Sequence, residues 1–369
     1  MSTPHLFAPL ISRGVTLPNR IVIPPLSQYA AVDGAAGDWH LVNAGRFAMG
    51  GAGTVIVEAT AVTADGRGTP GDLGLWRDDQ IAPLARIAAF LARNGAVPGI
   101  QLNHAGRKAA RRRPWHGGTA LDEADAARGE PPWPIHAPTD AAAFQGGARP
   151  SALTTSALPA LADRWADAAR RAASAGFRVL EIHAAHGYLL HQFLSPLVND
   201  RTDGYGGSLE GRMRFPLEVV AAVRAAWPAH LPLWVRLSAT EWVDGGWSVE
   251  DSVVFARALS LAGVDLVDCS SGGMTVGPVP TGPGYQVPFA ERVRAEAGVA
   301  TMAVGLIRDA AAAEDILARG AADLVAVGRE ALAQPNWPHL ARMELDPSVR
   351  DFRHWPAQTG WWLARRDPA

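Results

Sequence analysis

Residues 165–187 read WADAARRAASAGFRVLEIHAAHG, an alanine- and arginine-rich stretch that runs into a glycine and then into an apolar segment. A glycine directly after a helical pattern is typical of a left-handed C-cap, which ends the helix. The apolar segment is short and uninterrupted, as in parallel strands that are buried on both faces. This stretch therefore predicts a helix, a turn at Gly176 and a buried parallel strand.

The same pattern recurs along the chain, with Gly95, Gly263 and Gly320 at the corresponding turns. Four more apolar runs, NRIVIPP, GTVIVEAT, PLWVRLSA and TMAVGLI, bring the expected strands to eight, starting near residues 20, 53, 98, 178, 232, 264, 301 and 323. Eight such units predict an α/β fold, a single (β/α)8 TIM barrel rather than an open doubly wound sheet. Arg13-Gly14, between two short apolar pieces, indicates an N-terminal hairpin that closes the barrel bottom.

The third and fourth strands are much farther apart than the roughly 30 residues of a simple βαβ unit. The excess, residues 109–153, is rich in Pro, Gly, Trp and Ala, and it follows the strand end where barrel active sites are built. We expect a rim or lid insertion within one domain spanning residues 1–369, with a C-terminal tail at 336–369. The alternative for the insertion is a disordered loop.

The composition narrows the class of protein. Lys+Arg 34 against Asp+Glu 36 gives no basic excess, so nucleic acid is not an expected partner. A single cysteine, Cys269, excludes an intrachain disulfide and a cluster held by four thiolates; we expect it to be a buried apolar residue. The N-terminus lacks a signal-peptide pattern, and no run of about 18 apolar residues indicates a membrane span. The expected location is the cytoplasm.

The carboxyl ends of barrel strands meet at one mouth, which here collects hydrogen-bond donors, two histidines and few carboxylates. A metal site would need three or more carboxylate or histidine ligands, and a Schiff-base enzyme would need a strand-end lysine. Neither is present, so the mouth predicts a site for something polar, planar or anionic. Gly305, Gly328 and Arg329, after the last two strands, indicate a phosphate site, although either glycine alone could be a tight turn.

At this point the sequence resembles the old yellow enzyme family of FMN-dependent oxidoreductases. The resemblance runs from Leu6 to about Pro335 through NRIVIPPLSQY, GTVIVEAT, IQLNHAGRK, EIHAAHGYLLHQFLSPLVNDRTDGYGGSLEGRMRF, WVRLSA and AVGRE. It is closest to the bacterial thermophilic-like and xenobiotic-reductase branch. It implies FMN as cofactor, and cofactor contacts at Pro25, Leu26, Ser27, Ala59, Gln101, Arg236, Gly305, Gly328 and Arg329.

The resemblance also assigns the chemistry of the opening stretch. His183 and His186 would hold the carbonyl oxygen of an α,β-unsaturated substrate, and Tyr188 would give a proton to its α-carbon. Tyr29 would add a second phenol on the substrate side. The implied activity is an NAD(P)H-dependent ene-reductase. Alternatives are a related flavin enzyme acting on quinones, nitro compounds or N-methylated amines, a flavin-binding protein without turnover, and a flavin-free lyase. NADPH and NADH are not distinguished, because no separate dinucleotide unit is visible.

Two departures from the branch stand out. Ser27 lies where a flavin-tuning cysteine is common, so we expect an altered flavin potential. The tail HWPAQTGWWLARR contains Trp362, our candidate for a residue that reaches a neighbouring subunit's active site; Trp355, Trp361 or simple surface packing are the alternatives. These tryptophans and the resemblance favour a homodimer or higher homo-oligomer.

Overall fold

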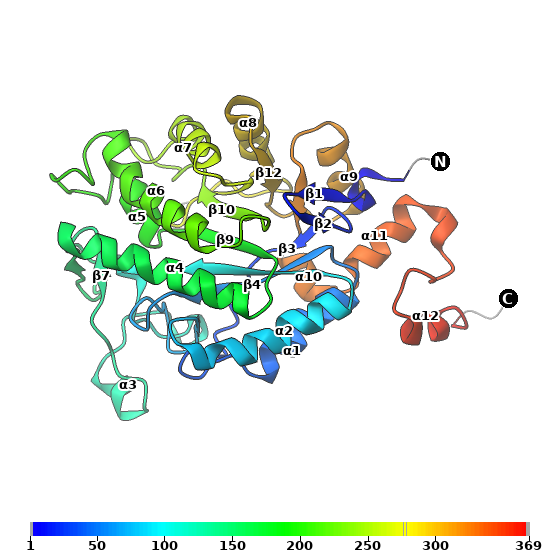
Figure 1. The fold of residues 1–369 in the computed structure, drawn as a ribbon, viewed down its shortest axis with the longest axis horizontal. Coiled ribbons are helices and arrows are strands. Elements are labelled where there is room, and N and C mark those ends of the chain that lie inside the picture. Colours follow the sequence, from blue (N-terminus) through cyan, green and yellow to red (C-terminus); the bar gives the residue numbers. More distant parts are fainter. Residues whose placement is uncertain (1–2, 276, 278, 367–369) are drawn as a thin grey trace.

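The computed structural model describes residues 3–275, 277 and 279–366, and in these residues eight parallel strands close into a barrel (Figure 1). The closure is complete because β13 pairs with β3, and β3 pairs with β4. All eight expected strands are found. They are β3 (Ile21–Ile23), β4 (Thr54–Ala61), β6 (Val97–Asn103), β9 (Val179–Ala184), β10 (Leu233–Ser238), β11 (Leu266–Ser270), β12 (Ala300–Ala303) and β13 (Leu324–Ala326).

Helices surround the barrel, and the short two-residue strand β5 (Leu73–Gly74) extends the sheet beside β4. The helices are α1 (Asp38–Met49), α2 (Ile81–Arg93), α4 (Leu158–Ser174), α5 (Leu189–Leu194), α6 (Leu209–Ala226), α7 (Val249–Leu261), α8 (Val287–Ala297), α9 (Ala310–Ala318), α10 (Arg329–Ala333) and α11 (Trp337–Leu345). Gly95, Gly176, Gly263 and Gly320 have φ of +84°, +86°, +89° and +73°. The left-handed turns predicted from the sequence are therefore confirmed.

The predicted hairpin is also present, as β1 (Leu10–Ser12) paired antiparallel with β2 (Val15–Leu17). Its turn lies against the barrel bottom, where Gly14 N–H donates to the His230 carbonyl at 3.0 Å. Within the described residues, no helix combines the length and apolar composition that a bilayer span requires.

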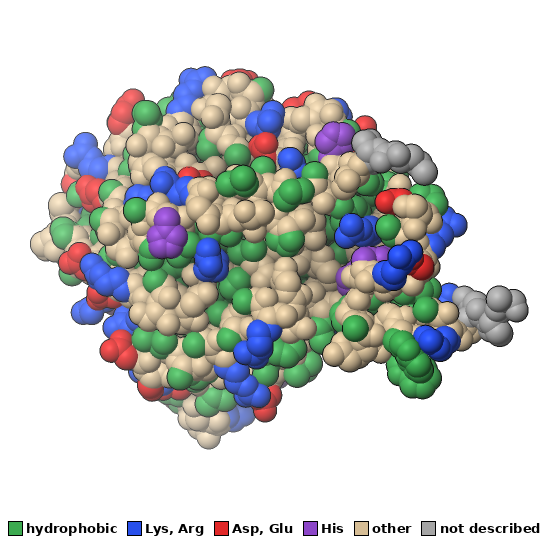
Figure 2. Space-filling model, turned by 45° about the vertical axis from the view of Figure 1, so that its right-hand side comes forward, with side chains coloured by type: hydrophobic (Ala, Val, Ile, Leu, Met, Phe, Trp, Pro, Cys, Tyr) green, Lys and Arg blue, Asp and Glu red, His purple; other side chains and the backbone are tan. Residues whose placement is uncertain are grey.

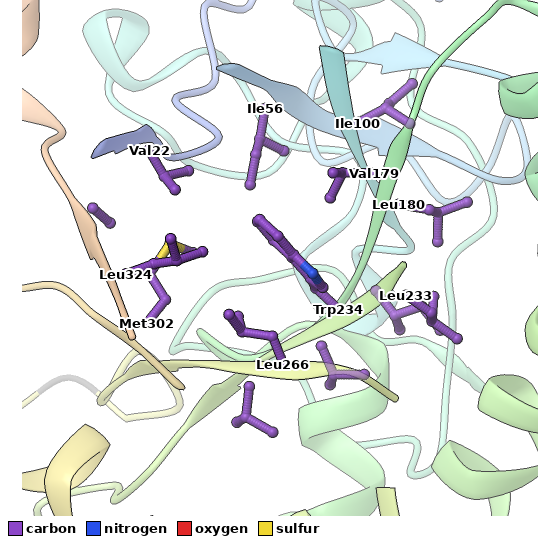
Figure 3. Close-up of a cluster of buried hydrophobic side chains, with 14 of the residues drawn as sticks. Val22, Ile56, Ile100, Val179, Leu180, Leu233, Trp234, Leu266, Met302 and Leu324 are labelled. Carbon is purple, nitrogen blue, oxygen red and sulfur yellow. The ribbon is translucent and has the colours of Figure 1, made fainter. Parts of the chain in front are cut away.

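The barrel interior is filled with side chains (Figure 3). Trp234 points into the centre of the ring, with Val22, Ile56 and Val179 around it, and it is fully buried. On the same strands Leu180 and Leu233 point outward toward the helices, as the two-residue alternation of a strand requires. The lower part of the barrel interior is therefore filled by side chains, so a ligand that enters the barrel has to bind at the mouth.

Two segments lie outside the βα repeat. The insertion carries α3 (Glu123–Ala127) and the paired strands β7 (His136–Ala137) and β8 (Ser151–Ala152). It is attached to the mouth by hydrogen bonds from Trp133 Nε1 to the Asp65 carbonyl, at 3.0 Å, and from Arg113 Nε to the Tyr29 carbonyl, at 3.1 Å.

The tail carries α12 (Ala357–Leu363) and lies at the opposite end of the barrel. There, Trp355 and Gln358 share a cavity with Gly51 and Gly95, which precede strands β4 and β6. Figure 2 shows hydrophobic side chains projecting beside the C-terminal end, where Trp361 and Trp362 are 53% and 69% exposed.

Candidate active site

A cavity of about 510 Å³ opens at the barrel mouth, built from the ends of strands β3, β10, β11, β12 and β13. It is lined by seven of the residues that the sequence had indicated: Pro25, Leu26, His186, Arg236, Gly305, Gly328 and Arg329. Ser270, Ser271, Gln286 and Arg308 border the same cavity. Its volume lies within the range of about 300–1,000 Å³ that small-molecule sites occupy.

The two histidines lie together at one side of this cavity. His183 Nε2 and His186 Nδ1 are 3.3 Å apart, and the two rings meet edge to face with centroids 5.1 Å apart. His186 Nε2 lies 2.7 Å from Ser270 Oγ, while His183 Nδ1 accepts the Ala185 N–H at 3.3 Å. His183 is the last residue but one of strand β9, whereas His186 lies in the following turn with a φ of +56°.

Burial, and secondly the charge of Arg236, lower the pKa of both His183 and His186 well below the usual range. Both rings are therefore neutral at pH 7, and each carries one N–H donor and one acceptor nitrogen. Neutral imidazoles can donate hydrogen bonds without adding positive charge to the site.

Tyr188 also lies beside His183, with its ring centroid 5.0 Å from that of the imidazole. Burial raises the pKa of its phenol, and the neighbouring Tyr29 phenol adds to the effect. Burial also raises the pKa of Tyr29, whose side chain interacts with the Ser27 hydroxyl. The two tyrosines and Ser27 are thus gathered near the histidine pair, and both phenols remain protonated at neutral pH.

A polar layer lies under the mouth on four adjacent strands. Gln101 Nε2 donates to Glu181 Oε1 at 2.8 Å, and Arg236 Nε lies 3.0 Å from Asp268 Oδ2. The parallel register pairs Gln101 with Glu181 and Arg236 with Asp268, so their side chains meet across neighbouring strands. Gln101 and Arg236 are 1% and 7% exposed. Glu181 and Asp268 were not singled out from the sequence, because an acidic residue inside an apolar strand gives no sign of its cross-strand partner.

The glycines at strands β12 and β13 differ from each other. Gly305 has a φ of +124°, and a Cβ there would lie 3.1 Å from the Gln286 backbone nitrogen, so this position requires glycine. Gly328 has an ordinary φ of −96°, and a Cβ would meet only Pro24 and Leu26 side-chain atoms at 3.5 and 3.6 Å. The conformation alone does not require glycine at 328.

Arg308 was missed by the sequence reasoning, although it follows Gly305 by three residues in VGLIRD. It borders the cavity together with Arg329, and neither guanidinium has a carboxylate partner in the described part of the chain. Ala59 is buried on β4, where the pairing register with β6 shifts. Trp362 lies on α12 at the far end of the barrel, so it does not line the mouth of its own chain.

Residues 5–347 match the model of the NADH:flavin oxidoreductase / NADH oxidase family. The protein belongs to this family. It is 44% identical over 346 residues to an NADPH dehydrogenase of Geobacillus thermodenitrificans, covering 93% of this chain and 95% of the relative. It is 41% identical to the NADPH dehydrogenase of Bacillus subtilis, covering 93% and 96%. Among solved structures, morphinone reductase superimposes with a TM-score of 0.77 at 30% identity, covering 94% of this chain and 93% of that one.

Membership confirms the resemblance to the old yellow enzymes and makes this chain an oxidoreductase of a family that uses FMN with NADPH or NADH. The geometry of the mouth, considered apart from the family relationship, also fits such a cofactor. The mouth offers a cavity of suitable volume, a glycine-lined wall, and Arg308 and Arg329, which have no carboxylate partner among the described residues. Cys269 is fully buried in strand β11, as expected for an apolar packing residue.

Proposed function

We propose that this protein is an NAD(P)H-dependent ene-reductase that reduces the C=C bond of α,β-unsaturated carbonyl compounds. The observation that carries the proposal is the arrangement of His183, His186 and Tyr188. Two neutral imidazoles meet at 3.3 Å beside a buried phenol, at the edge of a cavity of about 510 Å³. The arrangement supplies hydrogen-bond donors for an oxygen and a proton for a carbon.

The residues of the mouth would hold FMN in two regions. Gly305, Gly328 and Arg329, joined by Arg308, would bind its phosphate. Gln101 and Arg236 would contact the polar edge of the ring, and Pro25, Leu26, Ser27 and Ala59 would line it. When bound, FMN supplies the hydride that reaches the β-carbon of the alkene, after it has itself been reduced by NADPH or NADH.

The histidine pair would bind the substrate carbonyl oxygen. Because His183 Nδ1 accepts the Ala185 N–H, the single proton of this neutral ring lies on Nε2. The Ser270 hydroxyl next to His186 Nε2 can donate as well as accept, so it can leave the His186 proton on Nδ1 when a carbonyl oxygen arrives. Two N–H groups then converge on one oxygen, where negative charge develops as hydride reaches the β-carbon.

Tyr188 would complete the reaction as the general acid. Because burial raises the pKa of its phenol, the hydroxyl carries its proton throughout the neutral range. The O–H bond breaks as the proton moves to the substrate α-carbon, and the tyrosinate recovers a proton from solvent. Tyr29 would contact the substrate from the strand β3 side.

An anaerobic half-reaction series tests the proposal. The oxidised flavin band of the purified protein is bleached with NADPH, and 2-cyclohexenone is then added. Recovery of the band supports ene-reduction. Bleaching without recovery would leave a flavin enzyme with another acceptor, such as a quinone or a nitro compound. Absence of a flavin band after reconstitution with FMN would overturn the cofactor assignment as well.

We further propose a homodimer in which Trp362 reaches the neighbouring active site, and an insertion at 109–153 that acts as a lid over the mouth. The support is the exposure of Trp362 at the far end of its own barrel, and the edge-to-face contact between Trp115 and Tyr29, with centroids 5.7 Å apart. Truncation after Pro356 tests the first idea. If it spares both the oligomeric state and activity, Trp362 has no such role.

A further inference from the structure

Lys108 is the only lysine in a sequence that contains thirty-three arginines. It ends the short 3-10 turn Gly106–Lys108, just after strand β6, and its Nζ lies 5.7 Å from the centroid of the Tyr188 ring. The side chain is largely buried and forms no ion pair with a carboxylate in the described residues. A buried cation without a counterion is unfavourable, so its neighbours must supply another form of compensation.

Two backbone carbonyls compensate the ammonium group of Lys108 by accepting hydrogen bonds from it. Lys108 Nζ donates to the carbonyl of His186 at 2.7 Å and also to the carbonyl of Gly273. His186 belongs to the turn after β9, and Gly273 to the loop after β11. One ammonium group therefore bridges two segments that face each other across the end of strand β10.

Ser238, at the end of β10, makes a second bridge between the same two segments. Its Oγ accepts the His186 N–H at 3.0 Å and donates to the Gly272 carbonyl at 2.8 Å. Both peptide groups of His186 are thus held, the N–H by Ser238 and the carbonyl by Lys108. Together with the ring contacts to His183 and Ser270, every polar atom of His186 has a partner.

The conformation of His186 explains why such restraint is needed. Its φ of +56° lies in the left-handed region, which costs a residue with a Cβ about 1–3 kcal/mol and persists only where surrounding contacts determine it. The two segments also touch closely. A Cβ at Gly273 would lie 2.6 Å from His186 Cα, and a Cβ at Gly187 would lie 2.8 Å from Lys108 Nζ.

We propose that Lys108 is a positioning residue that, with Ser238, latches His186 in its left-handed turn and so aims its imidazole at the substrate carbonyl oxygen. The role of His186 in that statement rests on the proposed function. A compact ammonium with three donors fits between the two carbonyls and the Gly187 backbone. A planar guanidinium is larger and has a fixed fork of donors, so arginine cannot replace it there.

Kinetics of matched variants test the latch. Lys108→Met keeps the side-chain length and removes the donor, and Lys108→Arg keeps the charge. We expect both to lower kcat/KM for 2-cyclohexenone by roughly 10- to 100-fold, because a displacement of about 1 Å of a substrate-positioning group can cost that much. Arg111→Met is the control. Arg111 is a second cation of this loop that has no carboxylate partner in the part of the chain that the structure describes, but its Nε donates to the Gly118 carbonyl within the insertion. An equal loss in Arg111→Met would mean that the charge near the mouth matters and the latch does not.

Chemical rescue of a Lys108 variant provides an independent test of the latch. In Lys108→Cys, 2-bromoethylamine converts the thiol into a lysine analogue, while the fully buried Cys269 is shielded from the reagent. Recovery of most of the lost kcat/KM supports the latch. A correctly folded variant that keeps wild-type kcat/KM before alkylation would overturn it.

The crystal structure of Lys108→Met separates failure of the latch from failure of the proposed function. Departure of residues 186–187 from the left-handed turn supports the latch whatever the substrate is. An unchanged His186 backbone and imidazole overturn it, even if the enzyme reduces enones.

Discussion

The stability of the fold should depend on pH through Lys108, and the variant Lys108→Met isolates that dependence. Burial, followed by the charges of Arg111 and Arg107, lowers the pKa of Lys108 from 10.5 to about 8. The folded state therefore binds fewer protons than the unfolded state between these two values. Stability consequently rises as the pH increases through this window, and the full penalty of the buried ammonium is present below pH 8.

The size of the effect follows from the two pKa values. A difference of about 2.5 pKa units corresponds to about 3.4 kcal/mol at 1.36 kcal/mol per unit. Part of this destabilisation of about 3.4 kcal/mol remains at pH 10, because the lysine of the unfolded state is still mostly protonated there. Between pH 7 and pH 10 the wild type should gain about 2.5 kcal/mol relative to Lys108→Met.

Urea unfolding of both proteins with excess FMN, at pH 7, 8.5 and 10, measures the effect. The double difference is the change in the free energy of unfolding with pH in the wild type minus the same change in Lys108→Met. Other groups that titrate in this range cancel, because they are present in both proteins. As a direct check, lysine labelled with ¹³C at Cε gives a single protein signal, whose pH titration reports the pKa of Lys108 without assignment. A double difference below about 0.5 kcal/mol, or a pKa near 10.5, would refute the reasoning.

Four further outcomes are expected. Arg236→Met should lower the free energy of unfolding by about 3–5 kcal/mol in urea titrations, because it leaves Asp268 buried and unpaired; a loss under 1 kcal/mol would contradict the ion pair. Tyr188→Phe should slow the enone half-reaction by roughly 10²–10⁴-fold in stopped flow and leave reduction by NADPH within about twofold; equal slowing of both steps would argue against a proton donor. Gly305→Ala should weaken FMN binding in fluorescence titrations, since its φ of +124° disfavours any side chain; unchanged affinity would remove Gly305 from the phosphate site. Ser27→Cys should change the midpoint potential measured by dye titration, and an untouched potential together with unchanged half-reaction rates would show that this hydroxyl does not tune the flavin.

The sequence predicted the fold well because its signals are local. A glycine after a helical stretch needs φ above zero at that residue, and an apolar run is buried wherever a parallel sheet is covered on both faces. Gly176 and strand Val179–Ala184 could therefore be located before any contact was known. The same holds for residues at strand ends, since closing the barrel brings them to one mouth.

Contacts between strands could not be predicted in this way. Sequence reasoning assigns no role to Lys108, because it lies past the turn at Gly106 and not at a strand end. Its role follows from its hydrogen bonds to the carbonyls of His186 and Gly273, which lie in the loops after two other strands of the barrel. Ser238 was hidden for the same reason, because a serine at a strand end has no pattern that reveals which backbone groups it bridges.

The polar layer beneath the mouth shows how the barrel can bury the charge of Arg236 close to the site without a large electrostatic penalty. Arg236 lies among two carboxylates, and if both were ionised the layer would hold one excess negative charge in a dry interior. Burial, and then the charge of Asp268, raise the pKa of Glu181 to about 8, whereas Arg236 limits the rise at Asp268 to about 6. Glu181 therefore keeps its proton to a higher pH than Asp268, so Asp268 is the carboxylate that ionises first and balances Arg236. A layer close to neutral leaves the guanidinium free to respond to negative charge that develops at the mouth, which a second ionised carboxylate would cancel.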